Sequence, residues 1–247
     1  MFTGGIVTFL YDLVGVVLLK ASDLIIEYSD GTRAVDTVSF SVGAGENVAL
    51  IGANGAGKTS LLLALVGVLM PISGEIYAGE IMLAKKTLRE IRSHIGMVFQ
   101  NPDDQLFMTS IFDDVAFGPR SYGLDESETI RRVNAAMSKL KIEHLAERSP
   151  LKLSGGEKRL AAIATVLAMN PDFLILDEPN AFLDPRARRN LISVLLELPQ
   201  GKLIATHDLA FAEKMCSRVL LLQDGKIVAD GETKLLLDTD KLEAAGL

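Results

Sequence analysis

A glycine-rich segment between two apolar runs constrains this chain more than any other feature. Residues 52–59 read GANGAGKT, with a short β-type run at residues 47–51 before them and a helix-like apolar run at residues 60–70 after them, stopped by Pro71. Glycines let backbone N–H groups turn inward, and the start of a helix adds positive potential. A strand, such a loop and a helix in this order are the context in which a phosphate-binding loop folds.

The rest of the chain alternates short strands with helices. Strands are predicted at residues 24–28, 37–42, 95–99, 173–176, 203–206 and 219–223, and Asp224-Gly225 predicts a hairpin turn into residues 227–228. Helices are predicted at residues 155–169 and 186–198. This alternation predicts an α/β fold with a parallel sheet that is covered on both faces.

A helical insertion interrupts this pattern in the middle of the chain. Residues 101–154 lack β-branched runs, and Asp125 and Glu128 predict an acidic, capping-box-like start to a helix. Positions recur there at three- and four-residue steps: Ile130, Val133, Met137, Leu140 and His144. This spacing predicts one buried helix face.

Composition and charge exclude several classes of protein. Of the 247 residues, 49% are hydrophobic and 23% are charged, which excludes a disordered chain, a collagen-like fibre and a coiled-coil rod. The net charge is -7, whereas nucleic-acid binders usually carry an excess of Lys and Arg, so no nucleic-acid partner is predicted. The single cysteine, Cys216, cannot form an internal disulfide, which fits a reducing compartment.

The N-terminal region is apolar but does not read as a membrane span. Asp12 interrupts residues 6–19, which fall short of the ~20 residues that a span requires. No Lys or Arg precedes them, as a signal peptide would require. They are predicted to be a packed strand or helix, or an extension from an early start codon, so any membrane role is predicted to be peripheral.

Two carboxylates follow a second apolar strand. Residues 173–176 end at Asp177 and Glu178, and ligands collect at the carboxyl edge of such sheets. This predicts that Asp177 and the Thr59 hydroxyl bind Mg²⁺ and that Lys58 binds the β- and γ-phosphates. Glu178 would then polarise the attacking water as a general base. Two carboxylates at the end of a strand are often only solvated and have no catalytic role. Their occurrence together with a phosphate-binding loop favours the catalytic interpretation.

A second glycine-rich segment, residues 153–157, reads LSGGE. Ser154 and Glu157 have the spacing of a capping box, which gives both a structural explanation. The capping box does not explain Gly155 and Gly156. Two glycines at a helix N-terminus allow an anion to approach the backbone closely, and anions bind at helix N-termini. A second phosphate-seeking loop far from the first suggests that ATP is held between two chains.

These motifs, in this order, resemble the ATPase subunits of ABC transporters over about residues 18–231. Gln100 after a strand, Pro179 after the two carboxylates, Leu183-Asp184 and Thr206-His207-Asp208 complete the resemblance. It implies a P-loop NTPase core of RecA-like type with an antiparallel β edge and an inserted α-helical subdomain. The expected limits are an N-terminal extension at residues 1–17 and an ATPase domain at 18–247. Its core would lie at about 18–100 and 160–247, with the helical subdomain at about 101–159.

The resemblance also implies roles for individual residues, with ATP and Mg²⁺ as cofactors. Contacts to ATP are expected from Tyr28, Asn54, Gly55, Ala56, Gly57, Lys58, Thr59 and Ser60. Mg²⁺ ligands are expected at Thr59, Gln100 and Asp177, and catalytic roles at Glu178, His207 and Gln100. The partner chain's ATP would be contacted by Ser154, Gly155, Gly156 and Asp184. Tyr28 would stack on adenine; the alternative is an ordinary strand aromatic.

Two segments depart from the family pattern. Glu157 stands where the family usually has Gln, and a carboxylate facing the partner's nucleotide would add unfavourable charge, which capping its own helix avoids. Asn180, Ala181 and Phe182 replace the small, hydroxyl-bearing residues usual before Leu-Asp. The resemblance implies that Phe182, a bulky residue, lies at the seam between two chains.

Further segments resemble one branch of the family, the energy-coupling-factor importers for cobalt, nickel and vitamins. They are VFQNPDDQLF at residues 98–107, DDVAFGP at 113–119 and LAAIA at 160–164. Asp103 and Asp104 also read simply as a solvated helix start. The expected function is an ATP-hydrolysing motor subunit of a cobalt or nickel importer; vitamin cargo and another ABC transporter remain alternatives.

The branch implies partners and a location. The expected partners are a second ATPase chain, as a homodimer or a heterodimer of paralogues, an integral membrane coupling subunit and a substrate-capturing subunit. The expected location is the cytoplasmic face of the cell membrane. Alternatives from other classes are a small-molecule phosphotransferase, which has no need of residues 153–156, and another non-transport P-loop ATPase, such as a chromosome ATPase, whose sustained heptads are absent.

The stretch after Gln100 is the expected contact to the membrane partner. Its apolar side chains, Leu106, Phe107, Ile111 and Phe112, would offer a surface to a partner's helix. The alternative is that all four pack into the core of the helical insertion.

Overall fold

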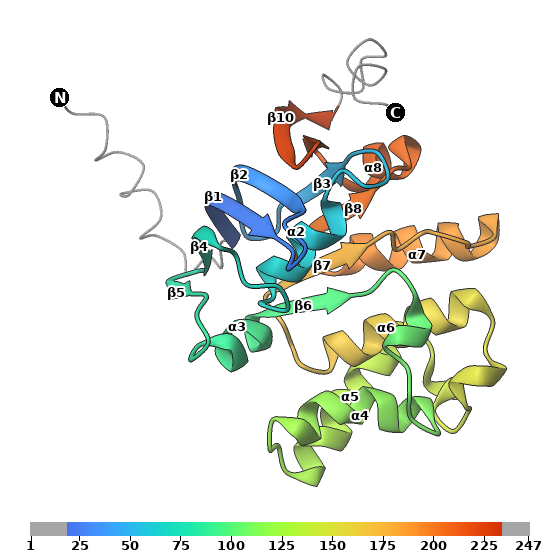
Figure 1. Ribbon diagram of the computed structural model, residues 1–247. Helices are drawn as coiled ribbons and strands as arrows, with labels where there is room; N and C mark the ends of the chain where they lie inside the picture. Colours follow the sequence, from blue (N-terminus) through green and yellow to red (C-terminus); the bar gives the residue numbers. More distant parts are fainter. Residues whose placement is uncertain (1–18, 234–247) are drawn as a thin grey trace.

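Six strands form the central sheet of the protein, a computed structural model in which residues 19–233 are described (Figure 1). The sheet order is β10-β9-β3-β8-β7-β6, and every neighbouring pair is parallel except β10 with β9. The strands are β3 (Asn47–Ile51), β6 (Ile95–Val98), β7 (Phe173–Asp177), β8 (Gly201–Thr206), β9 (Arg218–Gln223) and β10 (Lys226–Glu232). The predicted turn at Asp224-Gly225 joins β9 to β10, with both residues at positive φ, as a two-residue hairpin requires.

A second, antiparallel sheet lies beside the first. Its order is β2-β1-β4-β5. The strands are β1 (Leu19–Glu27), β2 (Arg33–Val42), β4 (Ser73–Ala78) and β5 (Ile81–Met82). The α/β prediction with an antiparallel β edge is therefore confirmed, although β4 and β5 were not predicted.

Side-chain alternation divides the interior into two hydrophobic clusters. In β3, Val48 and Leu50 point into the cluster between the two sheets, whereas Ala49 and Ile51 point into the cluster under the helices. Successive side chains of a strand face opposite ways, so a strand that is apolar at every position must be covered on both faces. All four of these side chains are fully buried.

Helices cover both faces of the parallel sheet (Figure 1). The helices are α2 (Lys58–Leu65), α3 (Leu88–His94), α4 (Ile111–Ser121), α5 (Glu126–Lys139), α6 (Gly155–Leu167), α7 (Pro185–Glu197) and α8 (Leu209–Met215). Helix α2 packs between the sheets, and α4 and α5 pack on α6 as a separate helical layer. Short 3-10 turns connect this layer: η1 (Pro102–Asp104), η2 (Glu143–Leu145) and η3 (Pro150–Lys152).

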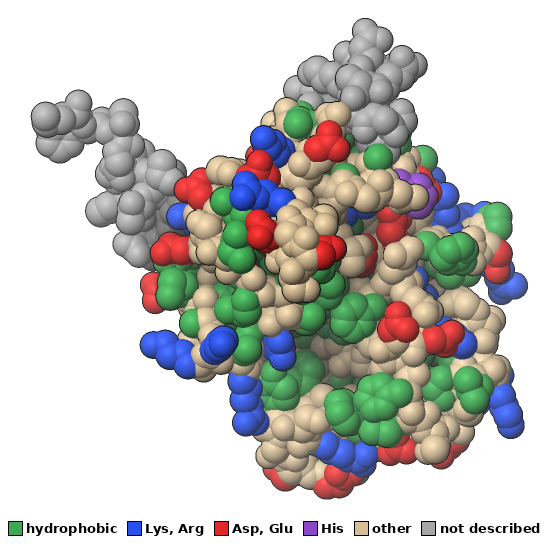
Figure 2. Space-filling model, viewed as in Figure 1, with side chains coloured by type: hydrophobic (Ala, Val, Ile, Leu, Met, Phe, Trp, Pro, Cys, Tyr) green, Lys and Arg blue, Asp and Glu red, His purple; other side chains and the backbone are tan. Residues whose placement is uncertain are grey.

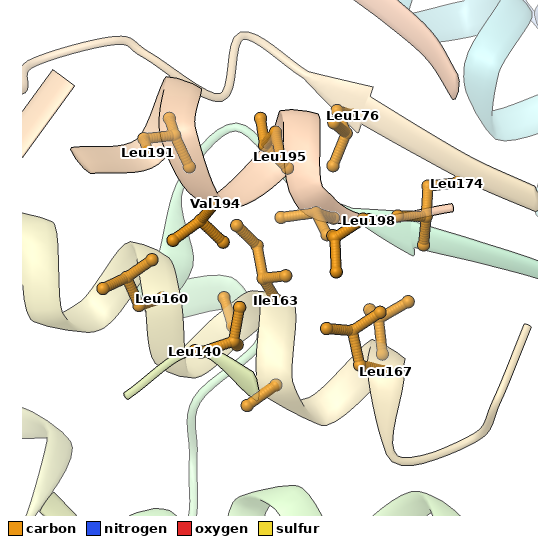
Figure 3. Packing of buried hydrophobic residues seen from close by; sticks show 14 of the residues in the cluster. Leu140, Leu160, Ile163, Leu167, Leu174, Leu176, Leu191, Val194, Leu195 and Leu198 are labelled. Atoms are coloured by element: carbon orange, nitrogen blue, oxygen red, sulfur yellow. The ribbon is translucent and has the colours of Figure 1, made fainter. Parts of the chain in front are cut away.

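Helix α6 joins the helical layer to the sheet. Figure 3 shows Leu160, Ile163 and Leu167 of α6 pointing toward side chains of α7 and β7. These contacts bury the apolar face that follows the LSGGE segment. The position of that segment is therefore fixed by the packing of α6 against the central sheet.

Some predicted boundaries differ from the structure. The helix predicted at residues 60–70 ends at Leu65, because the chain reverses at Gly67, whose φ is +65°, and Arg92 binds the carbonyls of Val66 and Gly67. Ile130 is 40% exposed and His144 is exposed, so only the middle of the predicted α5 face is buried. Sequence reasoning also missed α3 and α8.

The predicted start of α5 is half correct. Asp125 caps the helix by accepting a hydrogen bond from the Glu128 backbone at 2.9 Å. The Glu128 side chain does not reach back to Asp125; it binds Arg131 and Arg132 instead. These two cations hold the pKa of Glu128 at about 2.

The N-terminal prediction lies outside the described part of the chain, apart from Leu19. Among the described helices, none combines the length and the apolar character needed to cross a membrane.

Candidate functional site

One pocket of about 840 Å³ opens where β3 and β7 end and where the chain leaves β8. The predicted residues that line it are Tyr28, Asn54, Gly55, Gly57, Lys58, Thr59, Ser60, Gln100, Asp177, Glu178 and His207. Parallel strands bring these side chains together because their carboxyl ends meet at one edge of the sheet.

The loop between β3 and α2 wraps the floor of this pocket. Gly55 and Gly57 adopt φ values of +84° and +101°, a region that favours glycine. A Cβ atom at Gly57 would collide with the backbone carbonyl of Ala34. The side chain of Ala56 does not line the pocket and packs instead into the cluster between the sheets.

Lys58 is buried at the start of α2. Its Nζ atom donates to the carbonyls of Gly52 at 2.6 Å and Ala53 at 3.1 Å. Burial lowers the pKa of Lys58, and the carboxylates of Glu178 and Asp177 oppose that shift. The ammonium group is thus held by its own loop, beside the space where a phosphate would be cradled.

Thr59 and Asp177 form a pair of oxygen groups on the same wall. Thr59 Oγ1 donates to Asp177 Oδ2 at 2.9 Å, although the two residues are far apart in the sequence. The other oxygen, Asp177 Oδ1, is buried and makes no hydrogen bond within the described residues. Burial raises the pKa of Asp177.

This donor set fits Mg²⁺. Hard oxygen ligands with an unpaired carboxylate oxygen are what Mg²⁺ prefers, and it usually takes one or two carboxylates together with phosphates and water. Within residues 19–233, no group of three or more His, Cys, Asp or Glu side chains could hold a metal ion.

The carboxylate of Glu178 is held on both oxygens. Its Oε1 lies 2.8 Å from Nδ1 of His207, and its Oε2 accepts from the Thr206 hydroxyl at 3.3 Å. The backbone of Glu178 has a positive φ of 43° and donates to the carbonyl of Ala205. The side chain of Glu178 is 7% exposed and that of His207 is 60% exposed, so the histidine is the member of the pair that reaches solvent.

Tyr28 lies at the rim of the pocket at the end of β1. Its hydroxyl lies 2.8 Å from the hydroxyl of Ser60, and the residue is 41% exposed. The neighbouring turn adds Thr32, Arg33 and Ala34 to the lining, and Asp224 and Gly225 come from the β9–β10 turn. Sequence reasoning missed this lining, because turns distant in the sequence carry no motif of their own.

The LSGGE segment does not reach this pocket. Ser154, Gly156 and Asp184 line a separate pocket of about 640 Å³, and Gly155 lines a third of about 320 Å³. Asp184 accepts hydrogen bonds from the backbone of Arg186 and Ala187 and so caps α7. One chain therefore does not bring its two glycine-rich loops together.

Glu157 closes the capping box that its spacing predicts. Its Oε2 accepts from the Ser154 backbone at 2.8 Å, while the Ser154 hydroxyl accepts from the Glu157 backbone. Arg148 forms an ion pair with the same carboxylate at 3.3 Å. The carboxylate is thus turned toward its own helix.

A buried arginine that belongs to no predicted motif joins α6 to the pocket. Arg159 is 2% exposed and donates to the carbonyls of Phe99 at 2.7 Å and Gln100 at 2.5 Å. Gln105 also binds α6 through the Ala162 carbonyl, and burial lowers the pKa of Arg159 to about 10. The backbone of Gln100 is thereby bound to α6, the helix that Ser154 caps.

Comparisons with known proteins point to one family. A family model described as ABC transporter matches residues 35–181. A putative ABC transporter ATP-binding protein of Geobacter sulfurreducens is 47% identical over 227 residues, covering 92% of this chain and 91% of the relative. The energy-coupling factor transporter ATP-binding protein EcfA of Carboxydothermus hydrogenoformans is 42% identical over 232 residues, covering 93% and 86%.

Solved structures give the same result. The structure of cbiO1 from Clostridium perfringens, described as part of the ABC transporter complex cbiONQ, has a TM-score of 0.82 and 37% identity and covers 92% of each chain. A dimeric ATP-binding cassette, MJ0796, bound to ADP and Pi, has a TM-score of 0.78 and 26% identity, covering 87% of this chain and 98% of the other.

Proposed function

Because this chain belongs to the ABC transporter family of ATP-binding proteins, we propose that its ATPase activity drives a membrane importer of the energy-coupling-factor type. The observation that carries the proposal is the separation of the two glycine-rich loops. The pocket at the sheet edge holds the groups expected to bind and cleave ATP, while Ser154, Gly155 and Gly156 line other pockets. A second chain is needed to place the LSGGE loop on the ATP of the first.

In this proposal the pocket residues bind ATP through charge and backbone donors. The ammonium of Lys58 exchanges its two carbonyl acceptors for phosphate oxygens, and the ring of Tyr28 stacks on the adenine. Thr59, Asp177 and Gln100 hold Mg²⁺, which when bound supplies positive charge that offsets the charge of the phosphates. Asp177 Oδ1, which has no hydrogen-bond partner within the described residues, is the ligand atom best placed for this role.

Glu178 acts as the general base in the same proposal. Its carboxylate accepts a proton from a water molecule whose oxygen attacks the γ-phosphorus, while the bond from that phosphorus to the ADP oxygen breaks. His207 holds Oε1 of this carboxylate and lines the same pocket. Its other ring nitrogen would donate toward the γ-phosphate when the ring carries both protons. The products are ADP and inorganic phosphate.

A dimer of two such chains follows from the LSGGE loop. Its backbone N–H groups lie at the N-terminus of α6, where negative charge is favoured. The Glu157 carboxylate is bound by its own cap and by Arg148, so it adds little repulsion toward a partner's phosphates. The relative solved as a dimer with ADP and Pi supports this arrangement.

The membrane partner is proposed to dock where the helical layer meets the sheets. A groove of about 320 Å³ there is lined by Val68, Met97, Phe99 and Met169, among others. Figure 2 shows hydrophobic side chains gathered around a hollow on this face. Gln100, fixed by Arg159 immediately after Phe99, would relay the state of the ATP to this groove.

The expected contact surface is corrected by the structure. Leu106 and Ile111 are 6% and 0% exposed and belong to the hydrophobic core, while Phe112 is partly buried against it. Phe107 is 61% exposed and packs edge-to-face on Phe117 with ring centroids 5.0 Å apart. Of the four residues predicted for the surface, Phe107 is the one that stays available, and Phe117 joins it.

We extend the proposal to location, partners and cargo. The chain would act at the cytoplasmic face of the cell membrane, with an integral coupling subunit and a substrate-capturing subunit. The similarity to EcfA proteins and to cbiO1 of the cbiONQ complex supports the energy-coupling-factor type. Cobalt or nickel ions are proposed as cargo because the core at residues 18–231 resembles that subgroup of the branch most.

Purification from native membranes tests this function. The proposal expects at least two integral membrane proteins to co-purify with the chain, and cells carrying Glu178→Gln to lose uptake of labelled cobalt or nickel. Loss of vitamin uptake instead would retain the transporter and correct the cargo. A chain that hydrolyses ATP in the cell without any membrane protein attached would contradict the transport function.

A further inference from the structure

The turn between β9 and β10 is bonded to two other segments that border the large pocket. The backbone N–H of Gly225 donates to the carbonyl of Ala56, in the phosphate-binding loop, at 3.1 Å. The carbonyl of Gly225 accepts from the backbone N–H of Asp36, in β2, at 2.8 Å. Gly225 therefore links the phosphate-binding loop on one side to β2 on the other, and it lines the pocket itself.

The same three segments pack backbone against backbone. A Cβ atom at Gly225 would lie 2.9 Å from the carbonyl oxygen of Ala34, and one at Gly57 would lie 2.2 Å from it. A Cβ atom at Gly52, where the phosphate-binding loop begins, would lie 2.4 Å from the carbonyl oxygen of Leu222 on β9. A backbone carbonyl cannot turn aside as the end of a flexible side chain can, so the junction leaves no room for a side chain at these positions.

The turn that carries Tyr28 is thereby held against the phosphate-binding loop. Tyr28 begins the turn between β1 and β2, Ala34 lies just after that turn, and both line the pocket. The backbone N–H of Tyr28 donates to the Thr32 carbonyl at 2.9 Å and closes the turn. The Tyr28 hydroxyl, 2.8 Å from that of Ser60, adds a link to α2. The distance from the tyrosine ring to the phosphate-binding loop thus depends on how this turn is held.

We propose that Gly225 is a positioning residue for ATP, which sets the separation between the ring of Tyr28 and the phosphate-binding loop. The inference rests on the proposed function, in which this ring stacks on adenine and the loop cradles the phosphates. A ligand that is held at both ends loses affinity when the two ends are misaligned. Glu178 and His207 follow other strands, β7 and β8, so the effect is expected in the binding of ATP.

A double-mutant cycle between positions 28 and 225 tests the proposal. Four chains are compared: the parent, Gly225→Ala, Tyr28→Ala and the double variant. Calorimetry measures the dissociation constant for a non-hydrolysable ATP analogue with Mg²⁺, and the melting temperature of each chain is recorded. Gly79→Ala is the matched control, because Gly79 also has a positive φ, +58° against +75° at Gly225, whereas a Cβ atom there meets nothing within 4 Å and Gly79 does not line the pocket.

The proposal expects Gly225→Ala to raise the dissociation constant by about tenfold, since a displacement of about 1 Å can cost up to about 10²-fold. In chains that carry Tyr28→Ala, the same change should have less than a twofold effect, because the ring that it misaligns is absent. Gly79→Ala should bind like the parent. Equal losses with and without Tyr28 would show that Gly225 shapes the phosphate-binding loop alone, which would overturn the proposal. A parent chain that does not bind ATP would instead count against the proposed function.

Gly225→Asn separates the backbone contact from the strain of the positive φ. Asn adopts a positive φ more readily than Ala, while its Cβ atom meets the same carbonyl oxygen of Ala34. The Asn variant should therefore melt within a few degrees of the parent and lose as much affinity as Gly225→Ala. A folded Asn variant that binds like the parent would overturn the proposal. Failure of both variants to fold would assign the junction to the stability of the chain, against the proposal.

Discussion

At the scale of the residue, the carboxylate of Glu178 shows how several weak constraints fix one group. His207 and Thr206 each hold one of its oxygens, and its backbone donates to Ala205. Asn180 extends this network, since its amide donates to Asp208 at 3.0 Å and its oxygen lies 3.5 Å from the Thr206 hydroxyl. Asn180 departs from the family pattern, yet it binds groups around Glu178 that hold this carboxylate in place.

Replacing Glu178 by Gln tests its role as the base. Glutamine keeps the size and the hydrogen bond to His207, but it cannot accept the proton of the attacking water. The rate of phosphate release should fall by about 10²-fold or more, since general base catalysis contributes 10²–10⁴-fold. Binding of ATP, measured by calorimetry, should be retained. A variant that releases phosphate at the parental rate would remove Glu178 from the mechanism.

At the scale of the element, the turn between η1 and α4 separates two neighbouring side chains. Leu106 points into the core and Phe107 points to solvent. The carboxylate of Asp114 fixes this turn, because Oδ1 accepts from the backbone of Phe107 at 2.9 Å and Met108 at 3.0 Å. Burial raises the pKa of this carboxyl. A buried acidic residue of α4 thereby fixes the turn in which Leu106 is buried and Phe107 is exposed.

Substitution by serine at each of the two positions gives opposite expected outcomes. Leu106→Ser should lower the free energy of unfolding by about 2–5 kcal/mol, because it removes a buried side chain from the core. Phe107→Ser should lower it by no more than about 1 kcal/mol, because the side chain is exposed and loses only its contact with Phe117. Urea unfolding of the isolated chain measures both values.

The transport assay completes this comparison. Phe107→Ser should keep the ATPase rate of the isolated chain and reduce uptake by the reconstituted transporter. Uptake at the parental rate would show that the Phe107–Phe117 pair does not contact the membrane partner. A large loss of stability in Phe107→Ser would favour the alternative interpretation of the sequence, in which Phe107 packs into the core of the helical insertion.

At the scale of the whole molecule, one buried lysine links the central sheet to the end of α7. Lys202 is 1% exposed, and its ammonium donates to the carbonyls of Leu198 at 2.9 Å and Gln200 at 2.7 Å. Its Nζ atom also lies 3.4 Å from Asn47 Oδ1 on β3. Burial lowers the pKa of Lys202 to about 8. The charged form is therefore less favourable in the folded chain than in the unfolded chain.

This shift gives a pH dependence of stability with a definite sign. Between about pH 8 and the ordinary lysine pKa of about 10.4, the unfolded chain binds more protons than the folded chain, so stability rises with pH. The stability of the parent relative to Lys202→Met should therefore rise by about 2 kcal/mol from pH 7 to pH 9.5. Urea unfolding at both pH values measures the difference. A constant difference would mean that Lys202 has an ordinary pKa.

Local sequence was sufficient to predict the features that depend only on residues close together in the chain. The loop at residues 52–59, the capping box of Ser154 and Glu157, and strands such as β3 and β7 all follow from spacing within a few residues. Glycine content, alternation and helix capping act over that range, so a reader of the sequence can predict them. The family resemblance added roles for single residues but not their surroundings.

The tertiary structure alone decided which distant groups meet. Asp177, with one unpaired oxygen, meets Thr59 from another part of the chain. Arg159 of α6 likewise binds the carbonyls of Phe99 and Gln100. Packing also decides that Leu106 is buried while Phe107 is exposed. The exposure of Phe182 is of the same kind. No local rule encodes these contacts, because they arise only when the sheet, α6 and the helical layer pack against one another.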